Sequence, residues 1–241
     1  MPNYDGRGTH GQVVEAIGRA IVRGEHPEGA TLDIAALQAE HGVSLTVVRE
    51  ALKVLAGKGL VGARQRRGTF VQPRERWNLL DPDVLLWEIT PDTLPGMLDQ
   101  LAEVRAIVEP AASALAASRR DEADLAAIAT TLTSMEQAGD PAASTSADLA
   151  FHRAVLAATK NDLLARVELL TRSLFEERDR LVHEHVDGSA SLSLHRHLFE
   201  AIVAGDPAAA RRSTERIIGQ AATDAAATVT GLLAPDQSKA G

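Results

Sequence analysis

Hydrophobic residues recur at helical spacing along most of the chain, and the runs end at glycine, proline or asparagine. The clearest run covers 45–56, where Ser44 is a good N-cap because its hydroxyl can accept a bond from an unpaired N–H of the first turn. Its apolar face, which predicts docking onto a core, holds Val47, Val48, Ala51, Leu52 and Leu55. Its other face, which predicts contact with a partner, holds Thr46, Arg49, Glu50 and Lys53.

Two earlier runs, 10–23 and 33–41, predict two further helices, and the second ends at Gly42, a usual left-handed terminator. Because about three residues connect it to the helix at 45–56, we expect a helix-turn-helix unit. Strand-like segments at 60–64 and 68–72 then predict a hairpin. Together these elements predict a winged helix-turn-helix domain over residues 1–73.

The tip of the predicted hairpin is basic, with Arg64, Arg66 and Arg67 close together. Such a tip is suited to contact phosphates or the minor groove of DNA beside a recognition helix. The alternative is a basic turn that is merely solvated.

Every segment after residue 92 has helical character. With a short helix at 82–89, the pattern predicts seven helices with short connections, which favours an antiparallel bundle; the other six spans are 93–119, 121–138, 144–159, 162–184, 189–204 and 207–233. The predicted fold class is therefore mostly α, with an all-α domain at 93–241 behind a linker at 74–92. We expect Trp77 and Trp87 in that linker to hold the first domain against the second.

Net charge also differs between the two predicted domains. Residues 1–78 carry a net charge of +3, although the whole chain of 241 residues carries −8. Between 49 and 76 there are eight Lys/Arg against two Glu, and such a patch attracts phosphates. The acidic remainder is a poor surface for nucleic acid.

Composition excludes several classes of protein. The chain has no cysteine, so disulfides and thiolate metal sites are excluded. Aromatic residues make up only 3%, which leaves few rings on which the bases of a single-stranded nucleic acid could stack. Because the N-terminus lacks an apolar signal region and no apolar run approaches 18 residues, we expect a soluble cytoplasmic protein without a membrane partner.

Two residues of the helical region could hold one cation, and a histidine on another predicted helix is a further candidate for a site. Asp148 and His152 lie at i and i+4, on one face of a helix, and His195 lies at the edge of a second apolar face. The alternatives are a surface hydrogen bond for the first pair and a buried, satisfied histidine for His195.

Arg105 is the other candidate in the helical region. It lies among apolar residues on a helix that we expect to be mostly buried, and a buried arginine needs an anionic partner. That partner is either Glu109, one turn on, or the carboxylate of a ligand. Arg178 is a weaker second candidate for the ligand contact.

The N-terminal motif resembles the winged helix of the GntR family of bacterial transcription regulators. The residues that carry this likeness are Ser44-Leu-Thr-Val-Val-Arg-Glu-Ala-Leu52, Leu55, Gly59-Leu-Val61 and Arg67-Gly-Thr-Phe-Val71. The resemblance implies contacts with double-stranded operator DNA through Ser44, Thr46, Arg49 and Gly68. One departure is Leu45, where the family usually has a basic residue, and Arg64, Arg66 or Arg67 could replace the lost contact.

The helical region resembles the FCD domain of FadR-type members of that family. The resemblance implies a divalent metal, zinc, nickel or manganese, on Asp148, His152 and His195, with Arg105, aided by Glu109, holding an effector's carboxylate. The family's fourth ligand position is Ile217 here, so coordination positions are left for water or effector. The phrase from Trp77 to Trp87 is similar to the linker of members that respond to sugar acids such as galactonate.

We therefore expect a regulator, most simply a repressor, that binds an inverted-repeat operator as a homodimer and is released by a carboxylate effector. An enzyme that uses the open metal site is one alternative, although no nucleophile, carboxylate pair or phosphate loop accompanies the ligands. A regulator whose effector is the cation itself is another.

Overall fold

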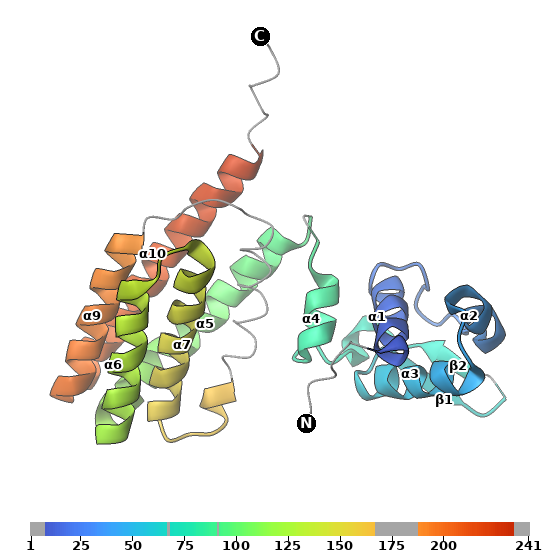
Figure 1. Cartoon of the computed structure of the whole chain (residues 1–241), viewed down its shortest axis with the longest axis horizontal. Coiled ribbons are helices and arrows are strands. Elements are labelled where there is room, and N and C mark those ends of the chain that lie inside the picture. The colour runs from blue at the N-terminus through green and yellow to red at the C-terminus, as the bar shows by residue number, and fades with distance from the viewer. Residues whose placement is uncertain (1–7, 67, 91, 167–187, 234–241) are drawn as a thin grey trace, which may run out of the picture. The chain divides into compact units, whose positions relative to one another are not determined.

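The protein forms two compact units, residues 1–90 and 91–241 (Figure 1). The structure is a computed structural model that describes residues 8–66, 68–90, 92–166 and 188–233. The winged helix and the all-helical region predicted from the sequence are both present, so the predicted fold class is confirmed.

The first unit contains the predicted helix-turn-helix and hairpin. Its elements are α1 (Thr9–Val22), α2 (Ile34–His41), α3 (Leu45–Gly57), β1 (Val61–Arg64), β2 (Gly68–Val71), the 3-10 turn η1 (Arg74–Arg76) and α4 (Pro82–Glu88). Asp33 caps α2 by accepting bonds from two backbone N–H groups, and Gly42 ends it with a left-handed φ of 62°. Ser44 caps α3, where its Oγ accepts from the N–H of Val47 at 3.4 Å. The local signals therefore begin and end these helices where the sequence predicted.

The apolar stripe of α3 lies in the core of the first unit. Val48, Ala51, Leu52 and Leu55 are buried, and Val47 packs against the same core. The polar residues of the opposite face are exposed. Burying one stripe and exposing the other is what fixes the direction in which Arg49 points.

The hairpin is antiparallel, with Val61 paired to Val71 and Arg64 paired to Gly68. Its turn needs two residues with positive φ, Arg66 at 67° and Gly68 at 81°. Thr31 forms an isolated bridge with Phe70, so the segment before α2 ties the hairpin to the helices.

The segment expected as a linker packs instead as part of the first unit. Trp87 is only 4% exposed and Val84 is fully buried, both in the same core as α1 and α3. The ammonium of Lys58 lies 2.8 Å from Asp81 Oδ1 and 2.6 Å from Asp83 Oδ2, which ties the end of α3 to the start of α4. The short helix expected at 82–89 thus belongs with the winged helix, not with the bundle.

Because Trp87 of α4 packs on α1, a side chain at Gly18, in the middle of α1, should lower the stability of the first unit. A Cβ at this position would overlap the six-membered ring of Trp87. Although Ala usually stabilises a helix interior by about 1 kcal/mol relative to Gly, we expect Gly18→Ala to destabilise the first unit by about 1–3 kcal/mol. Hydrogen exchange of peptides from α1 and α3 measures this loss.

Gly57→Ala is the matched control, because a Cβ on Gly57 meets nothing within 4 Å. We expect the control to leave exchange unchanged or slower. Equal exchange in the two variants would show that Trp87 does not pack on α1.

The second unit is the predicted helical bundle. Its described elements are α5 (Leu94–Arg119), α6 (Glu122–Gln137), α7 (Pro141–Ala158), the 3-10 turn η2 (Leu164–Arg166), α9 (Gly188–Ala204) and α10 (Pro207–Leu233). Helix α5 packs against α7, α9 and α10, and α6 packs against α7 and α9 (Figure 1). The helix expected over 162–184 lies outside the described residues from 167 on, and its first residues form a turn and η2.

Candidate functional site

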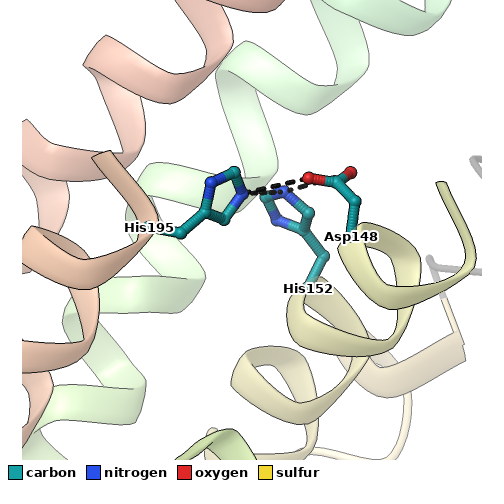
Figure 2. A group of neighbouring side chains, drawn as sticks. All are labelled: Asp148, His152 and His195. Carbon is teal, nitrogen blue, oxygen red and sulfur yellow. Dashed lines mark hydrogen bonds and ion pairs between the residues drawn. The ribbon is translucent and has the colours of Figure 1, made fainter. Parts of the chain in front are cut away.

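Three side chains from two helices of the bundle point toward one another (Figure 2). Asp148 and His152 lie on α7 and His195 lies on α9, and one ligand atom from each lies within 4.8 Å of the others. His195 is 1% exposed and His152 is 8% exposed, whereas the Asp148 side chain is 32% exposed. The two histidines are therefore buried within the bundle, whereas the Asp148 side chain is partly exposed.

The ring of His195 is fixed by its own helix. Its Nδ1 lies 2.7 Å from the backbone oxygen of Ser191, and because a carbonyl can only accept, Nδ1 carries the hydrogen. The Nε2 atom therefore turns inward, 3.1 Å from Asp148 Oδ1. Phe151, which is fully buried, meets this ring edge-on with the centroids 5.0 Å apart.

The ring of His152 is fixed by Glu109, which lies on α5. Its Nδ1 lies 3.2 Å from Glu109 Oε2, and its Nε2 lies 3.3 Å from Nε2 of His195. Both histidines thus use one ring nitrogen to hold their orientation and direct the other at the same point. Second partners of this kind orient the histidines of protein metal sites.

Three electron-pair donors converge at that point, namely the two Nε2 atoms and the Asp148 carboxylate. Such a convergence is repulsive unless a proton or a cation lies among the donors. Burial by itself would lower the pKa of His152, but Glu109 and Asp148 outweigh it and raise that pKa, so a positive charge is favoured here. The donor set of two nitrogens and one carboxylate oxygen fits a divalent transition metal.

Arg105 borders the cluster and is buried, at 6% exposure. Its Nε donates to Glu109 Oε1 at 2.6 Å, so the ion pair that the sequence left open as an alternative does form. Its Nη2 also lies 3.5 Å from Nε2 of His152. Burial alone would raise the pKa of Glu109, but His152 and Arg105 lower it to about 2, so Glu109 stays ionised.

Other residues considered from the sequence lie apart from this cluster or outside the described part. Ile217, at the position of a possible fourth ligand, is 4% exposed and belongs to the apolar core of the bundle. His197 is exposed, as expected from its place two residues after His195. Arg178 lies outside the described residues.

The link from Glu109 to His152 predicts an effect on cation binding. We expect Glu109→Gln to weaken cation binding by about 10- to 100-fold, because an amide holds the His152 Nδ1–H less strongly than a carboxylate does. Titration of the purified protein against a chelating indicator measures this affinity. Glu103→Gln, an exposed change on the same helix, is the control, and equal affinities in the two variants would contradict the orienting role of Glu109.

The exposed face of α3 is a candidate DNA interface. Ser44, Thr46 and Arg49 are all exposed on its first turns. The Ser44 hydroxyl accepts a bond as the helix cap and keeps its own hydrogen for an outside acceptor. Within the described part of the chain, the Arg49 side chain makes no hydrogen bond or ion pair, so its charge is available to a partner.

The hairpin places two of its basic residues at the tip. The Arg64 guanidinium lies 5.1 Å from the centroid of the Phe70 ring, and Arg66 occupies the turn. The positive φ of Gly68 explains why glycine stands there, since other residues rarely adopt that conformation. Arg67 lies outside the described residues.

Several contacts could not be found by reading the sequence. The second bond of Glu109, to His152, joins residues on two different helices, and no spacing in the sequence announces it. Ser191 acts on His195 through its backbone, so its side-chain type carries no signal. A lysine with two aspartates 23 and 25 residues away is likewise unremarkable in sequence, although Lys58 proves to be buried.

Two family models match the chain, one to each unit. Residues 9–71 match the model of bacterial regulatory proteins of the gntR family, and residues 100–220 match the FCD domain. The second match alone covers half of the chain. In the described residues, none of the helices is both long enough and apolar enough to cross a membrane.

Relatives of known role are transcription regulators. The chain is 34% identical to the galactonate operon transcriptional repressor of Escherichia coli over 213 residues, which cover 86% of this chain and 92% of the relative. It is 32% identical to the regulator LutR of Bacillus subtilis, with 79% and 89% covered, and 28% identical to the Glc operon transcriptional activator of Escherichia coli, with 83% and 82% covered.

Solved structures agree in fold. A Streptococcus agalactiae GntR protein superposes with a TM-score of 0.52 at 23% identity, over 89% of this chain and 99% of that one. A Listeria monocytogenes protein, described as Lar controlling the agr system, superposes with a TM-score of 0.57 at 20% identity, over 92% and 98%. Fold, family models and relatives together show that the chain belongs to the GntR family of bacterial transcription regulators, with an FCD domain, and that it is not an enzyme.

Proposed function

We propose that this regulator is a repressor whose FCD domain binds a small carboxylate at a metal-supported site and then releases the operator. The observation that carries the proposal is the convergence of Asp148, His152 and His195 beside the buried guanidinium of Arg105. A cluster of metal donors next to a fixed cation is suited to an anion that also carries oxygen donors.

The charges of the site favour an anionic ligand. Arg105 and Glu109 neutralise each other, and Asp148 supplies one further negative charge. With a divalent cation on the three donors, one positive charge in this largely buried site is left unmatched. Because an unmatched buried charge is costly, an incoming carboxylate would be favoured over a neutral ligand.

The donor set also favours a ligand with a hydroxyl beside its carboxylate. Two histidines and one aspartate would hold zinc, nickel or manganese, and the bound cation would supply a positive centre with coordination positions for ligand oxygens. Arg105 would orient the carboxylate, since a guanidinium has five N–H donors and can bond Glu109 and a ligand together. A 2-hydroxy acid presents both kinds of oxygen in the required proximity.

Among such acids we propose a sugar acid. The support is the galactonate operon repressor, which is similar to this chain along most of both lengths. Its name concerns galactonate for that protein alone, and the step to this chain is an analogy. We propose repression rather than activation because the galactonate operon protein is named as a repressor. The relatives also include an activator, that of the Glc operon.

On the DNA side we propose a homodimer bound to an inverted repeat. Two copies related by a two-fold axis would present two α3 helices, with Ser44, Thr46 and Arg49, to successive major grooves, and Arg64, Arg66, Arg67 and Gly68 to the flanking backbone. Effector binding would change the affinity for DNA by a coupling free energy between the two units.

Arg105 provides a specific prediction. We expect Arg105→Ala to leave operator binding intact but to weaken effector binding by about 10- to 100-fold, because a charge-assisted bond of about 1.5–3 kcal/mol is lost. The concentration of sugar acid needed to release a labelled operator measures this change. Arg196→Ala, which removes an exposed ion pair with Glu136, is the control, and normal release by Arg105→Ala would remove the clamp role.

A thermal-shift screen tests the proposal as a whole. The metal-loaded and the metal-stripped protein are each heated with a set of sugar acids and with matched neutral sugars. We expect a sugar acid to raise the melting temperature of the metal-loaded form, since a ligand stabilises the state that binds it. No stabilisation by any acid would contradict an acid effector.

A metal-sensing regulator is the second candidate, because the cation donors alone would suffice for it. It predicts that operator affinity changes when metal is added without any acid. Equal operator affinity with and without metal, together with release by a sugar acid, would exclude it.

A further inference from the structure

The outward face of α3 is polar except for one exposed leucine. Leu45, the first residue of the helix, lies between Ser44 and Thr46 and is 41% exposed. On a helix that meets the major groove of DNA, an apolar side chain can contact the methyl group of thymine.

Among the described residues of the first unit, Leu45 takes no part in the apolar core. Val43 and Val47, two residues to either side, both pack against the core, and Leu45 does not. The cap of α3 is Ser44, and an apolar contact across a helix start joins the residue before the cap to the fourth residue of the helix, here Val43 and Val48. Leu45 therefore contributes neither to the cap nor to the apolar contact at the start of α3.

Its place on the helix aligns Leu45 with the candidate DNA contacts. Residues four apart lie on one face of a helix, so Leu45 and Arg49 are neighbours, with Thr46 beside them. Further along, Glu50 and Lys53 bond each other at 2.7 Å. In a helix-turn-helix the first residues of the second helix are those that meet the edges of the bases.

The chemistry of a leucine limits what it can read. It has no donor or acceptor for a base or a phosphate, and the apolar group that distinguishes base pairs in the major groove is the 5-methyl group of thymine. We propose that Leu45 is a specificity residue that selects thymine by contact with this methyl group. The proposal rests on the DNA binding proposed above for α3.

The test removes the methyl group from the DNA and the side chain from the protein. An operator is first selected by the wild-type full chain from a duplex with randomised positions. Each thymine of that operator is then replaced singly by deoxyuridine, which lacks only the methyl group, and binding is measured for wild type and Leu45→Ala. Leu80→Ala, the same change at a leucine that is 68% exposed, is the control.

We expect deoxyuridine at one position of each half-site to weaken wild-type and Leu80→Ala binding by about three- to ten-fold, and to have no effect on Leu45→Ala. 5-Methylcytosine at that position should bind the wild type better than cytosine does. A thymine effect that is unchanged in Leu45→Ala, or no thymine effect in the wild type, would overturn this inference alone. Failure to select any duplex would overturn the proposed DNA binding and this inference with it.

Discussion

We expect Arg49→Ala to lower operator affinity by about 30-fold or more and to leave the fold intact. A bidentate contact from arginine to a base discriminates by about 1–3 kcal/mol, and a dimer makes that contact once in each half-site. The combined loss is about 2–6 kcal/mol, which corresponds to about 30- to 20,000-fold. Fluorescence anisotropy of a labelled operator at fixed salt concentration measures the change.

The fold should survive this substitution because Arg49 is exposed and alanine is a good helix former. Arg19→Ala is a suitable control, since Arg19 is a partly exposed residue of α1 that pairs with Glu15. Near-normal affinity is expected for the control. Unchanged affinity in Arg49→Ala would mean that α3 is not the helix that reads DNA.

The second large effect is expected at the cation site. His195→Ala should lower cation affinity by about 100- to 1000-fold, because four-ligand zinc sites are worth about 10–16 kcal/mol and each ligand supplies about a quarter of that. Calorimetric titration with zinc, nickel and manganese measures the loss. His197→Ala is the matched control, as it removes an exposed histidine two residues away.

A buried histidine can also matter for folding, so a second variant separates the two roles. Asp148→Asn removes a charged ligand whose side chain is partly exposed, and it should lose cation affinity without a large change in melting temperature. Cation affinity that is normal in both His195→Ala and Asp148→Asn would show that this cluster is a polar network of the core and not a metal site.

The sequence predicted the elements well because their signals are local. Ser44 and Asp33 cap their helices through bonds to N–H groups within three residues, and Gly42 needs only its own φ angle. The pairing of Asp148 with His152 is local in the same sense, because the helix places residues four apart on one face.

What the sequence missed depends on contacts between elements. Trp87 was expected to face the second domain, but its ring meets Gly18 of α1, a contact that only the packed structure defines. Glu109 was expected to serve Arg105, and it also bonds His152 from another helix. Packing partners so far apart in sequence follow from tertiary geometry, which periodicity does not encode.

The most direct test of the central claim measures release of operator DNA by a sugar acid from three forms of the protein. These are the metal-loaded wild type, the same protein stripped of metal, and Asp148→Asn in the metal concentration that loads the wild type. If Asp148, His152 and His195 receive the effector, galactonate or a related acid releases the operator from the metal-loaded wild type, and the other two forms need at least about 10-fold more acid. Release at the same concentration from all three forms would contradict the claim.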